Sequence, residues 1–503
     1  MRNERGDASR RKTGKPTFGG ALAVHACIFR VMLRRTEVTG AHHVIFFRQG
    51  CPVKMPAKIV HRIGLGGRVR AAVAFSVAAA LAWAITLAAK PTTLTPQERV
   101  AVFEKIWKVV DEHYYDPKFG GVDWKEVRQR YAPLVQGAKS DQEFYVLMDR
   151  MTAELHDAHT RFSSPEQWAN RKKHQGVSVG FRAGFVDGKV VVLDVTADSN
   201  AAKAGVQPGM VVTAVDGKAI EKQLADAENQ VLRSSSERVT KLRILSTIFS
   251  AGIEKPVDVR LERADGSALE AKFARQLLSN APQVISARLP DGFGYIRFDE
   301  FQHGLVRDFR GTLENFRNAP GLILDLRRNR GGDGATLEAI ARLFLDRKTL
   351  FERRMSRKQI SASPQESHRA AETRVFVGGR SEQIYGGPLV ILISEYSASA
   401  TEVFAAGMQD AGRATLAGGQ SCGCVLGITH DRKVKGGGVL EISEVLWFSP
   451  KGRRLEGEGV IPDQAAAPTI ASLRENRDVV LQAGEKTLEE SMAAAAKKAA
   501  AAQ

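Results

Sequence analysis

The chain has 503 residues, more than one ordinary domain needs, and its hydrophobic content of 43% is enough for several packed cores. Its formal charge of +17 is concentrated near the N-terminus, because residues 1–70 hold 15 Lys and Arg against 3 Asp and Glu. The rest of the chain carries only +5 of that total, which excludes a nucleic-acid-binding interpretation of the body.

An apolar segment at residues 70–89 follows a basic flank and predicts a secretory signal or a retained membrane anchor, assigned to residues 55–90. We therefore expect export to the periplasm or another extracytoplasmic space, or anchoring to a membrane by residues 70–89. Met55 opens a suitable signal sequence, so residues 1–54 are a doubtful basic extension: either they precede the true start or they form a basic arm.

Residues 91–172 are expected to form a helical domain. Thr95 is a candidate N-cap, Pro96 occupies the first helical position, and apolar residues follow at helical spacing. The stretch "DQEFYVLMDRMTAELHDAHTRF" predicts a second helix, ending in a polar turn. That turn contains His156, Asp157, His159 and Thr160.

Residues 175–275 change to a β pattern and resemble a PDZ domain of the kind found in processing proteases. A helical insertion, "EKQLADAENQVLRSSSERVTKLRILSTIFSAG", precedes its final strands, and Met210 stands where an acidic residue is usual. The resemblance implies strand addition by a peptide C-terminus, with backbone N–H groups binding its carboxylate. The implied loop is Gly176, Val177, Ser178, Val179, Gly180 and Phe181. The alternative is a β-barrel that only separates neighbouring domains.

Residues 283–470 alternate strands with helices, the latter expected near 304–317, 335–346 and 400–411. Short apolar runs such as "GLILDL" and "LVILIS" indicate buried, largely parallel strands. The fold class is therefore multidomain α/β, with an α/β core, a PDZ-like β domain and an N-terminal helical domain. Residues 471–503 are expected to be a low-complexity helix or a disordered tail.

Four stretches make the region from about residue 96 to 470 resemble the C-terminal processing peptidases, the tail-specific serine peptidase family S41. They are "GYIRFDEF", "LILDLRRNRGG", "SASATEVFAAGMQDAGRATLAG" and "GEGVIPD". The resemblance implies that Ser399 is the nucleophile, at the start of a helix whose dipole favours developing negative charge. It also implies an oxyanion hole made by backbone N–H groups of Ala400 and Gly331, with Gly332 as the neighbour.

The general base departs from that pattern. A lysine is expected 25 residues after the serine, and Cys424 stands there, in the turn "SCGCV". Tricorn-like peptidases of the same superfamily use a histidine and a glutamate instead; "LHDAHT" and "LEGEGVIPD" place these on His159 and Glu456. This resemblance implies a Ser399–His159–Glu456 triad. Ala158 replaces the serine that precedes the tricorn-like histidine, and so an auxiliary hydroxyl is missing.

Several alternatives for the site stay open. His156 is the rival histidine, and Lys433 or Lys435 could supply an amine. Asp410 matches a supporting aspartate of the family. Cys422 and Cys424 are interpreted as small buried residues, with a disulfide as the minority option and a cysteine-assisted site as a further one. Cys27 and Cys51 precede the apolar segment and so are not expected to share a compartment with this pair.

The leading hypothesis is a serine-type endopeptidase that acts on proteins or peptides through their C-termini and needs no cofactor or metal. Polypeptides, not nucleic acids, are the expected partners, and the oligomeric state is left open. The alternative is a catalytically inactive peptide-binding or scaffold homologue, because the lysine is absent.

Overall fold

The computed structural model describes residues 93–250, 255–279, 281–362, 372–379 and 383–501. The predictions for residues 1–54 and 55–90, including Cys27 and Cys51, lie outside these residues. Within the described part of the chain, no helix has the length and hydropathy that crossing a membrane requires.

The region after residue 93 begins with helices, as predicted. Thr95 caps α2 in a capping box with Glu98, and Pro96 is the first helical residue. Its buried face is the apolar stripe expected from helical spacing, including Val102, Phe103 and Ile106. The elements are α2 (Pro96–His113), η1 (Phe119–Gly121), α3 (Trp124–Gly137), α4 (Asp141–Ala153), β1 (Arg161–Ser163) and α5 (Pro165–Lys172).

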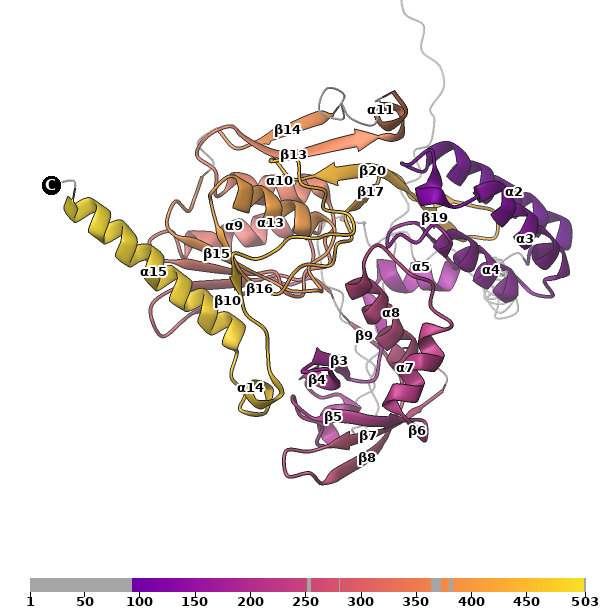
Figure 1. Ribbon diagram of the computed structural model, residues 1–503, viewed down its shortest axis with the longest axis horizontal. Helices are drawn as coiled ribbons and strands as arrows, with labels where there is room; N and C mark the ends of the chain where they lie inside the picture. Colours follow the sequence, from indigo (N-terminus) through magenta and orange to yellow (C-terminus); the bar gives the residue numbers. More distant parts are fainter. Residues whose placement is uncertain (1–92, 251–254, 280, 363–371, 380–382, 502–503) are drawn as a thin grey trace, which may run out of the picture. The chain divides into compact units, whose positions relative to one another are not determined.

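A β-rich region follows, and its main sheet has the order β3-β4-β5-β7-β8, with β6 paired to β5. A separate antiparallel pair joins β2 to β9. The predicted insertion forms two helices between β6 and β7 (Figure 1). The elements are β2 (Gln175–Ser178), β3 (Phe181–Val186), β4 (Lys189–Val195), α6 (Asn200–Lys203), β5 (Val211–Val215), β6 (Lys218–Ala219), α7 (Ile220–Glu228), α8 (Glu237–Ser250), β7 (Val257–Glu262), β8 (Ala268–Phe273) and β9 (Gln276–Ser279).

The remaining chain folds around a sheet with the order β10-β11-β12-β15-β16-β21. All neighbours pair in parallel except β10 and β11, which confirms the predicted α/β core. The elements are β10 (Ile285–Arg288), β11 (Gly294–Arg297), α9 (Leu305–Glu314), β12 (Leu322–Asp325), α10 (Gly334–Arg342), β15 (Leu389–Ile393), α13 (Ala400–Asp410), β16 (Thr415–Gly418), β21 (Gln464–Ala465), α14 (Ile470–Arg474) and α15 (Val479–Ala501).

The two faces of this sheet are covered by different helices. Because successive strand residues point to opposite faces, Leu322 and Leu324 pack in the cluster that contains residues of α9, α10 and α13. Ile323 packs on the other face, with Val480 and Leu488 of α15. The segment predicted as a tail therefore contributes part of the core through the first half of α15.

Two smaller sheets complete the described structure and were not predicted. One has the order β14-β13-β20-β17, and the other has the order β1-β19-β18. The second pairs Phe162, which follows the helical region, with Leu440 from late in the chain. The remaining elements are β13 (Thr349–Ser356), α11 (Arg357–Ala362), β14 (Thr373–Val377), β17 (Leu426–Ile428), β18 (Arg432–Lys433), β19 (Val439–Glu441) and β20 (Ser443–Phe448).

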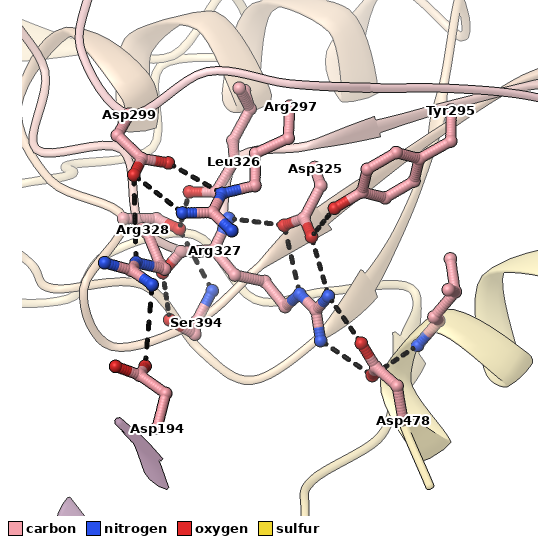
Figure 2. Close-up of polar contacts among 12 residues, drawn as sticks. Asp194, Tyr295, Arg297, Asp299, Asp325, Leu326, Arg327, Arg328, Ser394 and Asp478 are labelled. Carbon is pink, nitrogen blue, oxygen red and sulfur yellow. Dashed lines mark hydrogen bonds and ion pairs between the residues drawn. The ribbon is translucent and has the colours of Figure 1, made fainter. Parts of the chain in front are cut away.

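An ion pair between the buried Asp325 and the half-buried Arg327 fixes the carboxyl end of β12 (Figure 2). Asp325 is 3% exposed; its carboxylate accepts hydrogen bonds from the Tyr295 hydroxyl at 2.8 Å and from the Arg327 guanidinium at 2.6 and 3.0 Å. Arg327 also pairs with Asp478, just before α15. The backbone carbonyl of Arg327 accepts from Ser394 Oγ at 2.7 Å. This network therefore holds the turn after β12 against the turn after β15.

We predict that Asp325→Asn lowers the free energy of unfolding by about 3 kcal/mol at pH 7, because it leaves the half-buried Arg327 guanidinium without its closest counter-charge. Burial alone would raise the pKa of Asp325, but Arg327 holds that pKa below its usual value. The contribution is therefore present above the unfolded-state pKa and is lost as the pH falls through the folded-state pKa.

Urea unfolding at pH 7 and at pH 3 would measure this, with Asp308→Asn as the control because Asp308 belongs to an exposed ion pair with Arg307. The account fails here if the two variants lose equal stability at pH 7, or if the loss in Asp325→Asn does not shrink in acid.

Candidate active site

Ser399 lies between β15 and α13, where the chain makes a sharp turn. Its backbone has φ 59° and ψ −123°, a strained conformation for a residue with a side chain. Two acceptors hold its N–H, the Cys424 carbonyl at 2.8 Å and the Glu402 carboxylate at 3.0 Å. The Ser399 hydroxyl makes no hydrogen bond to another side chain of the described residues.

Asn329 joins the turn after β12 to the start of α13. Its side-chain oxygen accepts from Thr401 Oγ1 at 2.6 Å and from the Gly331 N–H at 2.9 Å, and its carbonyl accepts from the Ala398 N–H at 3.1 Å. Asn329 is fully buried. It therefore fixes the distance between the glycine turn and Ser399.

The predicted oxyanion-hole residues meet at this junction. A side chain at Gly331 would have its Cβ 2.6 Å from Ser399 Cβ and 2.9 Å from the Ala400 nitrogen, so the two turns touch. The Gly331 N–H is already bonded to Asn329, whereas the N–H groups of Ala400 and Gly332 have no partner among the described residues. Gly332 is thus the better donor of the two glycines.

Cys422 and Cys424 are both buried and joined by a disulfide, the minority option from the sequence. With Glu402 they bring three potential metal ligands together. The Glu402 oxygens already accept from Ser421 Oγ at 2.6 Å and from the N–H groups of Gly423 and Cys424, besides Ser399. In this oxidised form, neither sulfur can accept a proton from Ser399.

Burial raises the pKa of Glu402 to about 7, although its four hydrogen bonds act in the opposite direction. The residue is fully buried at the first turn of α13. Its part in this structure is to bind the disulfide turn to the backbone of Ser399.

His159 lies in the polar turn after α4. The backbone N–H of His159 donates to Asp157 Oδ1 at 2.7 Å. The same carboxylate oxygen accepts from the backbone N–H of Thr160 and from the Ser443 hydroxyl. Its Nδ1 is buried without a hydrogen-bond partner in the described residues. Burial, followed by the charge of Arg161, lowers the pKa of His159 to about 4, so its ring is neutral at pH 7.

Glu456 is 6% exposed, and its Oε2 accepts from the Val425 N–H at 2.6 Å. Burial raises the pKa of Glu456 to about 8. Hydrogen bonds from Ser235 and Val425 oppose this, and the charges of Asp157 and Glu402 add to it.

No hydrogen bond joins Ser399, His159 and Glu456 to one another in the part of the chain that is described. Ser399 and Glu456 are linked through two adjacent residues, Cys424 and Val425. Ser399 bonds the Cys424 carbonyl, and the next residue, Val425, bonds Glu456. Glu456 and His159 both lie within electrostatic reach of Asp157.

The other candidates occupy separate places. Lys435 is exposed and pairs with Glu98 of α2 at 2.6 Å, and Lys433 is exposed in β18. His156 is exposed, with Nδ1 3.3 Å from the Arg233 carbonyl. Asp410 binds Arg453 at 2.6 Å and Ser449 Oγ at 2.6 Å, so it stabilises the turn that precedes Glu456 and makes no contact with Ser399.

The predicted peptide-binding loop spans the end of β2 and the start of β3. Gly176, Val177 and Ser178 pair with β9, and Val179 and Phe181 are buried. The Gly180 N–H donates to Ser178 Oγ at 3.0 Å. A peptide carboxylate that used this N–H would have to displace the Ser178 hydroxyl.

Three polar residues of the site were not predicted: Asn329, Glu402 and Ser235. Asn329 stands inside the "RRNRGG" stretch, and Glu402 stands three residues after Ser399, the spacing of a capping box. These two local patterns could have identified Asn329 and Glu402 from the sequence. Ser235 carries none, because it lies in the insertion and meets the Ala158 N–H, next to His159, only in the fold.

Residues 292–466 match the model of peptidase family S41, and residues 95–153 match the tricorn protease C1 domain. The carboxyl-terminal-processing protease of Synechocystis sp. is 26% identical over 82% of this chain and 91% of its own length. The chloroplastic carboxyl-terminal-processing peptidase 3 of Arabidopsis thaliana is 25% identical over 82% of this chain and 78% of its own length.

Solved structures support the fold. The photosystem II D1 C-terminal processing protease matches with a TM-score of 0.50 at 24% identity, over 75% of this chain and 94% of that chain. Mature CPAF complexed with lactacystin matches with a TM-score of 0.58 at 13% identity, over 79% of this chain and 98% of that chain.

We predict that Gly331→Ala slows labelling of Ser399 by a fluorophosphonate by about 10²-fold or more, because the new methyl group would displace Ser399 and disturb the N–H groups beside it. Gly304→Ala is the matched control: its φ of 96° nearly equals the 97° of Gly331, and its Cβ would meet no atom within 4 Å. Both variants place an alanine at nearly the same positive φ. Equal labelling rates would show that the junction of the two turns does not control the serine.

Proposed function

The chain carries a peptidase family S41 domain and is a homologue of carboxyl-terminal-processing serine peptidases, and from this premise we propose a Ser399–His159–Glu456 endopeptidase. The observation that carries the proposal is the state of Ser399. It is a strained serine at a helix N-terminus and touches Gly331, and the N–H groups of the adjacent residues Ala400 and Gly332 have no partner among the described residues. His159 is half-buried and neutral at pH 7, and its Nδ1, which has no hydrogen-bond partner in the described residues, is available to act as a base.

In the proposed mechanism, the His159 imidazole accepts the proton of the Ser399 hydroxyl as its oxygen attacks the scissile carbonyl carbon. The carbonyl oxygen becomes an oxyanion and accepts hydrogen bonds from the N–H groups of Ala400 and Gly332. When the C–N bond breaks, His159 returns the proton to the leaving amine, and an acyl-enzyme on Ser399 remains. Water activated by the same imidazole then releases the peptide acid.

Glu456 takes part as the carboxylate that orients His159 and stabilises its positive charge. Because the pKa of Glu456 is about 8, only part of the enzyme holds it ionised at neutral pH. Small rearrangements on substrate binding must then close the contacts between Ser399, His159 and Glu456, as is common in catalytic sites that tighten around substrate.

We further propose that the region 175–275 acts as a PDZ-like domain that takes up polypeptide C-termini. Support comes from the short sheet strands, the left-handed Gly180 and the exchangeable Ser178–Gly180 hydrogen bond. On this proposal, a reporter with an amidated C-terminus is cut more slowly than its free-acid form, and equal rates would contradict it.

Export directed by residues 55–90 is part of the same proposal, and N-terminal sequencing of the mature protein tests it.

The second candidate is an inactive peptide-binding homologue. It is favoured by the lack of any direct hydrogen bond within the triad in the described chain and by the disulfide in place of the lysine. It predicts peptide binding without turnover. Labelling of Ser399 by a fluorophosphonate, absent in Ser399→Ala, would count against it.

We predict that His159→Ala lowers the rate of cleavage of an unfolded reporter by about 10³-fold, as expected for a lost general base. Ser399→Ala should abolish the remaining acyl-enzyme chemistry. The matched control is His156→Ala, three residues earlier in the same turn, whose exposed ring should be dispensable. If His159→Ala cleaves as fast as the wild type, the histidine is not the base.

We predict that kcat/KM of the wild type falls as the pH drops through about 8, because protonation of Glu456 removes the charge that stabilises the imidazolium ion. The low pKa of His159 keeps the free base neutral over this range. Glu456→Gln should have a lower maximum and lose this acid limb. A limb that persists unchanged in Glu456→Gln would assign it to another group.

A further inference from the structure

The disulfide turn, residues 422–424, binds the nucleophile turn at two points. The Cys422 N–H donates to the carbonyl of Ser397, two residues before Ser399, at 3.0 Å. The Cys424 carbonyl accepts from the N–H of Ser399 itself at 2.8 Å. Each cysteine therefore holds one backbone group of the strained serine turn, and the bond between their sulfurs fixes the spacing of these two contacts.

Glu402 adds a second set of contacts to the same turn. Its carboxylate accepts from the N–H groups of Gly423 at 2.7 Å and Cys424 at 2.9 Å. The same carboxylate accepts from the Ser399 N–H at 3.0 Å. A Glu402 oxygen and the two sulfurs all lie within 4.8 Å of one another. The disulfide is thus packed beside the carboxylate that helps to hold the serine backbone.

The disulfide closes a loop of only three residues, and so it constrains its own turn more than the rest of the core. A disulfide stabilises a fold as a whole more strongly when the loop that it closes is longer. The Cα atoms of the two cysteines are 5.3 Å apart, within the usual range for a disulfide. Between them, Gly423 has φ 73°, a left-handed conformation that glycine adopts without strain. Reduction can therefore change this turn and leave the parallel sheet intact.

Reduction must displace the turn, because two thiols cannot stay as close together as two bonded sulfurs. Cys422 and Cys424 are only 3% and 2% exposed, and a packed interior leaves the thiols no free space beside them. The backbone has to shift to separate them, and this shift displaces the groups that hold Ser397 and Ser399. Burial also disfavours the thiolate form. The reduced turn thus loses its hold on the serine without gaining a base.

We propose that the Cys422–Cys424 disulfide is a redox switch of the active site: the oxidised turn holds Ser399 ready for attack, and reduction by a dithiol slows it. This inference rests on the proposed function. One thiolate of the dithiol attacks a cysteine sulfur, the S–S bond breaks, and the other cysteine leaves as a thiolate that takes up a proton. The second thiol of the reagent then displaces the attacked cysteine. The dithiol loses two electrons and two protons to become a disulfide, and the protein gains two thiols.

Such a switch suits a peptidase that is exported. Cytosolic reductants keep cysteines as thiols, whereas the periplasm and other extracytoplasmic spaces favour disulfides. A chain newly made in the cytosol would carry the reduced turn, and its serine would react slowly with cytosolic polypeptides. Oxidation after export would close the disulfide and raise the reactivity of the serine.

The test measures how fast a fluorophosphonate labels Ser399 in the full chain after equilibration with a dithiol at graded ratios of its reduced and oxidised forms. Equilibration is needed because buried sulfurs exchange only when the turn opens. The labelling rate should fall by about tenfold or more on reduction, since a misplaced nucleophile loses its attack geometry. It should recover when the oxidised reagent is restored. Counting of free thiols in the unfolded chain reports the redox state of each sample.

The double variant Cys422→Ser with Cys424→Ser should label at the reduced rate and should not respond to the dithiol. The matched control is Cys27→Ser with Cys51→Ser, which removes two cysteines outside the described residues and keeps this disulfide. It should respond as the wild type does. The proposal is overturned if reduced and oxidised wild type label equally fast, or if the response disappears in the control instead.

Hydrogen exchange of the Ser399 amide separates this inference from the proposed function. Reduction should speed that exchange, because the Cys424 carbonyl no longer holds the N–H, while the amides of β12 keep their protection. This result would support the switch even if the wild type cleaves no reporter. If the wild type cleaves and the Ser399 exchange does not change on reduction, the proposed function stands and the switch is refuted. Equal acceleration in β12 would indicate a general loss of structure and would also refute it.

Discussion

The candidate site depends on the clamp that holds the backbone of Ser399 in a left-handed conformation at the start of α13. The Cys424 carbonyl and the Glu402 carboxylate share the Ser399 N–H, and Glu402 also binds the backbone of the disulfide turn. On the other side, Asn329 bonds the backbone N–H groups of Ala398 and Gly331. Because both clamps are buried, the serine cannot relax into an ordinary turn, and its hydroxyl is presented without a competing side-chain partner.

The ionisation states of His159 and Glu456 are set mainly by burial. Burial keeps His159 neutral and makes ionised Glu456 costly, so the two groups are driven toward the uncharged forms in the free protein. A developing imidazolium ion reverses this balance, because it is the counter-charge that Glu456 lacks. The arrangement favours charge separation in the transition state over charge separation in the resting enzyme. The Val425 N–H, which donates to the Glu456 carboxylate at 2.6 Å, favours the ionised form of Glu456.

Much of the fold followed from local sequence patterns. The parallel α/β core and α13 arise from short apolar strands followed by amphipathic helices, and the start of α2 from the Thr95 capping box, all of which are local signals. The sheet that pairs Phe162 with Leu440 was not predictable, because it depends on contacts between segments far apart in the chain. The packed half of α15 was also hidden, since its Ala-rich end gives the whole helix a low-complexity composition.

The candidate site likewise contains residues that carry a sequence signal and features that only the fold reveals. Ser399 and its neighbouring glycines stand in stretches whose spacing carries a signal, and the structure brings these stretches into contact. The choice of Gly332 over Gly331 as donor depends on one hydrogen bond, which the Gly331 N–H donates to the side-chain oxygen of Asn329 and which requires the folded turn. The disulfide likewise required the three-dimensional turn, because Cys-x-Cys spacing alone favours no bond.

The most direct test of the account is a crystal structure of the chain with Ser399 covalently phosphonylated, a stable mimic of the tetrahedral intermediate. The account predicts an imidazole nitrogen of His159 within about 3.2 Å of the phosphonyl group, a Glu456 oxygen on the other ring nitrogen, and a phosphonyl oxygen bound by the N–H groups of Ala400 and Gly332. If His159 keeps its unpartnered Nδ1 in the adduct while Lys433, Lys435 or a reduced Cys424 approaches the phosphonyl group, the proposed triad is wrong.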